Sequence, residues 1–199
     1  IYALYLSFMQ TTGIPFYQIP GNHDHAEHFP FHQNKNQVHV LHFGQWSIVL
    51  LNTAVPNQID GWVAQQHLHQ LEHILETYAQ QFMIVACHHH PFEMQSKWID
   101  QHKLKNTNNL LDVLNKHSNI KAVICGHVHQ DSLREWQNIQ FFSTPSTCVQ
   151  FKPLSDHFAL DDESPGFRVL SLKENGELDT VVHRVANTQQ KINIEISGY

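Results

Sequence analysis

Two short motifs carry side chains that could bind a metal ion. Gly126-His127-Val128-His129 places two imidazoles two residues apart, and in an extended segment such residues point to the same side. His88-His89-His90 is a run of three, in which the same alternation separates the middle histidine from its neighbours. Neutral imidazole is a ligand for Zn, Fe, Mn or Cu ions. Spacing therefore indicates metal-binding histidines in two places, without saying which histidine of the run binds.

A third motif, Gly21-Asn22-His23-Asp24, combines an amide, an imidazole and a carboxylate. The side-chain oxygen of Asn22 is a neutral metal ligand, and His23 could serve as an acid or as a hydrogen-bond donor beside a metal. Asp24 could orient His23 through a ring N–H, as carboxylates do around many histidine sites. The alternative is an Asx turn at Asn22, because Gly-Asn is common in such turns.

Histidine is abundant, at 18 of 199 residues, so chance spacings are frequent. The two histidine motifs therefore also have plainer interpretations. His127 and His129 could be hydrogen-bonded surface histidines, and His88-His89-His90 could be a solvated run before Pro91. His69 and His73 lie four residues apart on a predicted helix, but they lack the H-E-x-x-H pattern, and we interpret them as a solvated helix face. The sequence contains no P-loop, G-x-S-x-G or Rossmann fingerprint.

The elements that must position these motifs follow from hydrophobic patterning. Phe82–Cys87 and Ile120–Cys125 are unbroken apolar runs of strand length, and each ends directly at a histidine motif. A short strand over residues 15–20 leads into Gly21. Three loops that each follow a strand suit a site in the crevice at one end of a sheet.

The remaining pattern predicts further helices and strands. A helix ends near residue 10, a short one lies over 26–31, and amphipathic spacing predicts others over 63–78 and 110–114. Residues 38–43 and 46–53 form a hairpin turned at Gly44-Gln45. Shorter strands are predicted over Ser132–Trp136, Ile139–Ser143, 167–172 and 180–185. The tail from about 187 is polar and peripheral. We predict one mixed α/β domain over 1–199.

Composition narrows the class of partner and the compartment. The formal net charge of -6, with no basic run, argues against a nucleic-acid partner. No long apolar stretch indicates a membrane span. Three cysteines, of which Cys87 and Cys125 end apolar runs, fit reduced, buried thiols and a cytoplasmic location. The chain begins at Ile1, and this start is typical of a cut into an existing domain.

The order G-N-H-D, a His run before Pro, and G-H-x-H resembles the calcineurin-like metallophosphoesterase superfamily. Within it, the chain is most similar to the bacterial class III 3′,5′-cyclic AMP phosphodiesterases. That narrower resemblance also extends to Gly198-Tyr199 and includes four segments, residues 87–91, 98–102, 125–130 and 145–153, the last reading Pro-Ser-Thr-Cys-Val-Gln-Phe-Lys-Pro. It implies an α/β (α+β) fold of two packed mixed β-sheets flanked by helices.

The resemblance also implies the roles of particular residues. Asn22, His88, His127 and His129 would be metal ligands, so the first histidine of the run is the one that binds. Asn22, His23 and His129 would contact the substrate phosphate. Beyond the resemblance, we expect His23 to be the acid that protonates the leaving 3′ oxygen in the intact enzyme, with Asp24 orienting it. The implied cofactors are two metal ions, Fe and Mn first and Zn as an alternative, and the implied partner is a small cyclic nucleotide.

One departure from the family pattern stands out. The family begins with strands that end in D-x-H and G-D, and neither motif occurs before Gly21. We therefore expect an N-terminally truncated chain whose N-terminal strands are missing, and an intact enzyme that hydrolyses 3′,5′-cyclic AMP to 5′-AMP at a dinuclear metal centre. The alternatives are a metallophosphoesterase that acts on another phosphodiester or a phosphomonoester, and an inactive fragment with an incomplete metal site.

Overall fold

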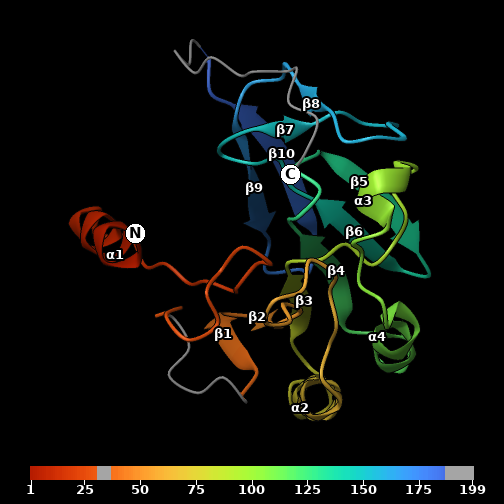
Figure 1. The fold of residues 1–199 in the computed structure, drawn as a ribbon. Helices are drawn as coiled ribbons and strands as arrows, with labels where there is room; N and C mark the ends of the chain where they lie inside the picture. The colour runs from red at the N-terminus through yellow and green to blue at the C-terminus, as the bar shows by residue number, and fades with distance from the viewer. Residues whose placement is uncertain (31–36, 187–199) are drawn as a thin grey trace.

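A six-stranded sheet forms the centre of the computed structural model, which describes residues 1–30 and 37–186 (Figure 1). The strand order is β1-β2-β3-β4-β6-β5. β2, β3, β4 and β6 are parallel, whereas β1 and β5 pair antiparallel at the two edges. The bounds are β1 His39–Phe43, β2 Trp46–Leu50, β3 Phe82–Cys87, β4 Ile120–Cys125, β5 Ser132–Trp136 and β6 Ile139–Ser143. The carboxyl ends of the four parallel strands therefore meet at one edge.

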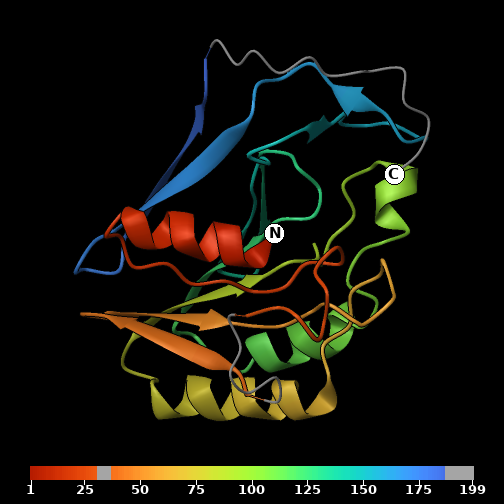
Figure 2. The ribbon, with the colours of Figure 1, turned by 60° about the vertical axis from the view of Figure 1, so that its left-hand side comes forward.

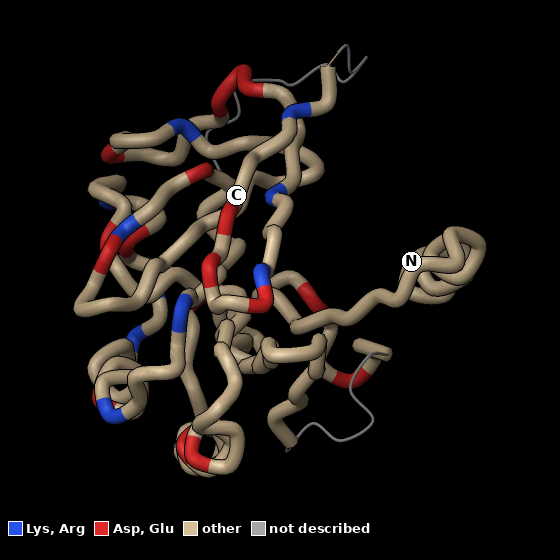
Figure 3. The backbone as a smooth tube through the Cα atoms, turned by 180° about the vertical axis from the view of Figure 1, so that it is seen from behind, with Lys and Arg blue, Asp and Glu red and all other residues tan. Residues whose placement is uncertain are grey.

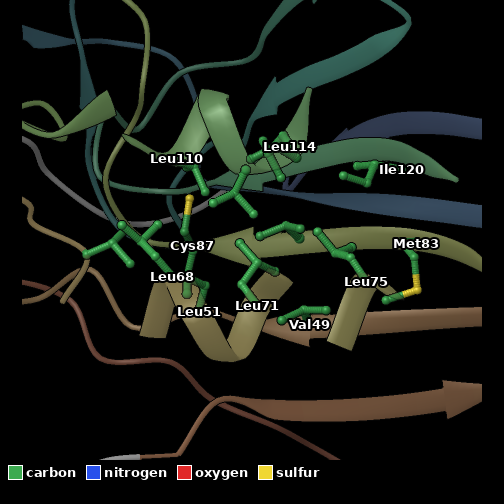
Figure 4. Packing of buried hydrophobic residues seen from close by; sticks show 14 of the residues in the cluster. Val49, Leu51, Leu68, Leu71, Leu75, Met83, Cys87, Leu110, Leu114 and Ile120 are labelled. Atoms are coloured by element: carbon green, nitrogen blue, oxygen red, sulfur yellow. The ribbon is translucent and has the colours of Figure 1, made fainter. Parts of the chain in front are cut away.

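Two amphipathic helices cover one face of this sheet. They are α2, Gln65–Thr77, and α4, Thr107–Leu114, and their apolar sides are buried against the strands (Figure 4). The buried side chains of this layer include Val49, Leu51, Leu68, Leu71, Leu75, Met83, Cys87, Leu110, Leu114 and Ile120. This packing makes the strands that carry the histidine motifs a rigid support.

A β-hairpin covers the opposite face, so the described chain has three layers (Figure 2). Its strands are β9, Gly166–Leu172, and β10, Leu178–Arg184, and their leucines pack on Trp46 and Phe142 of the sheet. Trp46 Nε1 also donates to Lys173 O at 2.8 Å, which ties the hairpin turn to β2. The mixed α/β class is thus confirmed, with an antiparallel hairpin as the second sheet of the described residues.

Three smaller elements complete the described chain. β7, Gln150–Phe151, pairs with β8, Leu160–Asp161, beside the short helix α3, Lys97–Asp100. α1, Tyr2–Thr11, begins the chain and buries none of its side chains. No helix among the described residues combines the length and apolar character needed to cross a bilayer.

Most predicted elements are confirmed, and two are wrong. The two apolar strands and the pair β5–β6 have the predicted bounds. The predicted hairpin is present, as are the predicted helices other than the short one over 26–31. Residues 15–20 form no strand, and residues 26–30 form turns instead of a helix. Residue 31 and the predicted polar tail from 187 lie outside the described residues.

Candidate metal centre

The three predicted motifs come together at the carboxyl edge of the parallel strands. His88 follows β3 and Gly126 follows β4, and the Gly126 N–H donates to His88 O at 3.1 Å. The loop of Asn22 reaches the same place from the N-terminal segment. A Cβ at Gly21 would lie only 2.8 Å from His88 Cε1, so glycine lets that loop pack directly on the His88 ring.

Side-chain atoms of Asn22, His88 and His127 form a compact triangle, called the donor triangle below. His88 Nε2 lies 3.0 Å from Asn22 Oδ1 and 3.2 Å from His127 Nδ1, and the third edge measures 3.1 Å. An amide oxygen only accepts, and a neutral imidazole has a single N–H. The two imidazoles therefore supply at most two N–H donors, whereas hydrogen bonds along all three edges of the donor triangle would need three.

A metal ion fits the donor triangle better than hydrogen bonding alone does. Two ligand atoms about 2.1 Å from a shared ion lie about 3.0–3.4 Å apart in octahedral or tetrahedral coordination, and all three edges fall in this range. One amide oxygen and two imidazole nitrogens suit a borderline divalent ion such as Zn, Fe or Mn. The residues present thus fit the metal that the sequence implied.

The rest of the histidine run faces elsewhere. His89, His88 and His127 have ring nitrogens close enough to share an ion. The His89 nitrogens, however, both have partners, Thr53 Oγ1 at 2.9 Å and Ile59 O at 3.0 Å. His90 Nε2 lies 3.5 Å from the carboxylate of Asp100. Geometry therefore favours His88 as the ligand of the run, in agreement with the resemblance.

His129 lies beside the donor triangle and not in it. Its Nδ1 donates to the carbonyl of Val149 at 2.9 Å, because a carbonyl only accepts, and Nε2 keeps its lone pair. Its ring stacks on Phe151 with 4.2 Å between centroids. His127 and His129 both have φ of 51°, an uncommon left-handed backbone for a non-glycine residue. Such strain occurs often at functional sites.

Asp24 closes the loop that carries Asn22 and His23. Its two carboxylate oxygens accept from the Tyr2 hydroxyl at 2.7 Å and from the Gly21 N–H at 2.8 Å. The Asp24 N–H donates in turn to Gly21 O at 3.1 Å. His23 is exposed at the tip of this loop. The contacts explain how Asp24 fixes the loop, and its orienting role toward His23 stays a prediction.

Burial keeps the histidines of the centre neutral. Loss of solvent contact, followed by the neighbouring histidines, lowers the pKa of His88 to about 3. The same two causes strongly lower the pKa of His127. Burial also lowers the pKa of His129 to about 4, although its hydrogen bond to Val149 acts in the opposite direction. Neutral imidazole is the form that binds metal, so these lowered pKa values favour ligation at pH 7.

Two residues of the centre were missed by sequence reasoning. Thr53 follows β2, the next parallel strand, and its hydroxyl contacts both the backbone and the ring of the histidine run. A polar residue shortly after a third parallel strand was the signal that could have identified it. Phe151 supports the His129 ring, and the segment 145–153 that contains it was noted only for its resemblance.

Comparisons with known proteins identify the family of this chain. Residues 1–131 match the model of the calcineurin-like phosphoesterase family. The 3′,5′-cyclic adenosine monophosphate phosphodiesterase CpdA of Vibrio vulnificus is 38% identical over 91% of this chain and 68% of its own length. The CpdA of Haemophilus influenzae is 33% identical over 100% and 74%. The fold is similar to that of a dimetal phosphatase from Danio rerio, with a TM-score of 0.59, 13% identity, and coverage of 83% of this chain and 71% of that one.

Proposed function

Because this chain belongs to the calcineurin-like phosphoesterase family, we propose that it hydrolyses 3′,5′-cyclic AMP to 5′-AMP. The donor triangle of Asn22, His88 and His127 supports the proposal, because three side-chain atoms of the kinds that bind metal meet at the carboxyl edge of the sheet. The choice of substrate is supported by the two relatives named as cyclic AMP phosphodiesterases.

The family implies a dinuclear divalent metal centre, and a histidine cluster is present in this chain. We assign the three residues of the donor triangle to one ion and His129 to the other, with Fe and Mn as the proposed pair and Zn as the alternative. Bound ions of this kind polarise a phosphoryl oxygen and lower the pKa of water to about 7. Because the pKa values of His88 and His127 are lowered, each imidazole is neutral at neutral pH and keeps a lone pair that can bind an ion.

The chain's own residues perform the remaining tasks. Asn22, His23 and His129 contact the phosphate and hold it over the centre. Water adds its oxygen to phosphorus while the bond from phosphorus to the 3′ oxygen breaks. His23, exposed beside the buried histidines, donates a proton to the departing 3′ oxygen. Such general acid help is worth about 10²–10⁴-fold in rate. Asp24 orients His23 through the loop that it closes.

We also propose a cytoplasmic location, where the substrate is a free small molecule. Cys87 and Cys125 are paired neighbours on β3 and β4, and both are buried, free thiols. Burial raises the pKa of Cys87 to about 12, so the thiol stays protonated and unreactive. Reduced, buried cysteines support a reducing compartment.

A turnover panel tests the substrate. The metal-loaded protein is assayed with cyclic AMP, cyclic GMP and bis(4-nitrophenyl) phosphate, and 5′-AMP is quantified by chromatography. We expect hydrolysis of cyclic AMP that is lost with EDTA and restored by Mn²⁺ or Fe²⁺. Turnover of the aryl diester without turnover of cyclic AMP would keep the phosphodiesterase and remove the proposed substrate.

A further inference from the structure

A fully buried hydroxyl lies beside the histidine run. Thr53 follows β2, and its side chain is 0% exposed. Its Oγ1 accepts the backbone N–H of His88 at 3.3 Å and that of His89 at 3.1 Å. The same oxygen lies 2.9 Å from His89 Nδ1. One hydroxyl therefore contacts three groups of two successive histidines.

The partners of His89 fix where its proton lies. Its Nε2 lies 3.0 Å from Ile59 O, and because a carbonyl only accepts, Nε2 must carry the hydrogen. Nδ1 is then a lone pair and accepts from the Thr53 O–H. The hydroxyl thus donates one hydrogen bond and accepts two, which is its full capacity. His89 has no lone pair left for a metal.

Gly61 also lies directly against the His89 ring. A Cβ at Gly61 would lie 2.4 Å from His89 Cγ, so only glycine fits against this ring. The backbone of Gly61 is fixed in turn, because its N–H donates to Lys103 O at 3.3 Å and its carbonyl accepts from Lys105 N–H at 2.9 Å. The His89 ring therefore contacts two fixed groups, the Thr53 hydroxyl and the Gly61 backbone.

We propose that Thr53 is the positioning residue of the metal centre. By holding both backbone N–H groups and the His89 ring, it orients the run so that His88 faces Asn22 and His127 while His89 is kept out of the centre. The proposal rests on the proposed function in one respect, the assignment of His88 as a metal ligand. Thr53 itself touches neither metal nor substrate.

A first experiment needs no metal. Long-range ¹H–¹⁵N spectra of the metal-free protein at pH 7.5 assign the tautomer of each imidazole. We expect His89 as the Nε2–H tautomer in the native protein and in Thr53→Ser, which keeps the hydroxyl. A proton on His89 Nδ1 in the native protein would overturn the proposal.

A second experiment measures metal affinity by competition with a fluorescent chelator. Thr53→Val has nearly the same shape but leaves two buried N–H groups and one ring nitrogen without a partner. We expect it to bind Mn²⁺ about 10–100-fold more weakly, as is typical when support of a ligand is removed, and Thr53→Ser to restore the affinity. Thr180→Val on β10 is the matched control, because it loses a hydrogen bond from Arg168 of β9.

The outcomes separate the positioning role of Thr53 from the proposed function. If the native protein binds Mn²⁺ and Thr53→Val binds equally well, the positioning role is refuted and the proposed function stands. If the native protein binds no metal, both are refuted. Should Thr53→Val fail to fold, Gly61→Ala displaces the same ring, because its Cβ would lie 2.4 Å from His89 Cγ. It is expected to weaken Mn²⁺ binding over the same range, and native affinity in Gly61→Ala would overturn the proposal.

Discussion

At the residue scale, burial separates the proposed metal ligands from the proposed acid. His88 and His127 are enclosed by other histidines and by the Asn22 loop, and their pKa values are lowered. His23 lies on the same loop but is exposed, where it can meet a substrate. One histidine-rich centre therefore offers two kinds of imidazole, which differ because of their distance from solvent and not because of their sequence spacing.

Substituting His23 tests its role as the acid. We expect His23→Ala to lower kcat for cyclic AMP by about 10²–10⁴-fold, because the 3′ oxygen then leaves without a proton donor. Metal content, measured by mass spectrometry, should remain that of the native protein. His69→Ala, an exposed histidine on α2, is the control and should change neither quantity. Loss of metal in His23→Ala would instead make His23 a structural residue.

At the element scale, the sequence was most informative where apolar runs were long. The strands at Phe82–Cys87 and Ile120–Cys125 were predictable because a buried parallel strand is apolar on both faces. Their end positions also predicted where His88 and His127 would lie. Residues 15–20 were predicted wrongly as a strand, since Pro15 and Pro20 have no N–H to pair in a ladder.

The side-chain detail of the centre could not be predicted. Spacing left the choice within the histidine run open, because that choice depends on Thr53 and Ile59, which are distant in sequence. The support of His129 by Phe151 likewise depends on the path of a loop. Contacts between segments that are far apart in the chain leave little trace in local patterns.

The packing of α2 against the sheet gives a stability prediction. Leu71 is 0% exposed in the core between α2, α4 and the strands (Figure 4). Leu71→Ala should lower the free energy of unfolding by about 2–5 kcal/mol, because it removes apolar contact and leaves a cavity. Urea denaturation measures it, and His69→Ala on the exposed side of the same helix should change it by less than about 0.5 kcal/mol. Equal effects would show that α2 does not pack as described.

At the scale of the whole molecule, the sheet brings the histidine motifs together at the carboxyl edge of its parallel strands. Lys and Arg are interspersed with Asp and Glu along the described chain (Figure 3). The single-domain organisation over 1–199 remains a prediction.

The buried histidines also couple the stability of the whole molecule to pH. In the folded chain the pKa of His88 is about 3 and those of His89 and His129 are about 4, against about 6.5 in the unfolded chain. Between those values the unfolded state binds more protons, so acidification destabilises the fold. The loss amounts to at most about 1.4 kcal/mol per pH unit for each histidine.

Urea unfolding of the metal-free protein in EDTA at pH 7 and pH 5 measures this effect. We expect a clearly smaller free energy of unfolding at pH 5, and a smaller pH dependence in His129→Gln, which removes one of the titrating groups. Equal stability at the two pH values would show that these histidines are not buried as described.

The most direct test of the central claim is the X-ray absorption spectrum of the protein loaded with one equivalent of Mn²⁺. The donor triangle predicts a shell of nitrogen and oxygen with the outer scattering of two imidazoles, from His88 and His127. His127→Ala should lose one imidazole, whereas His69→Ala should keep both. A sulfur shell, or a spectrum that His127→Ala leaves unchanged, would contradict the assignment of the metal centre.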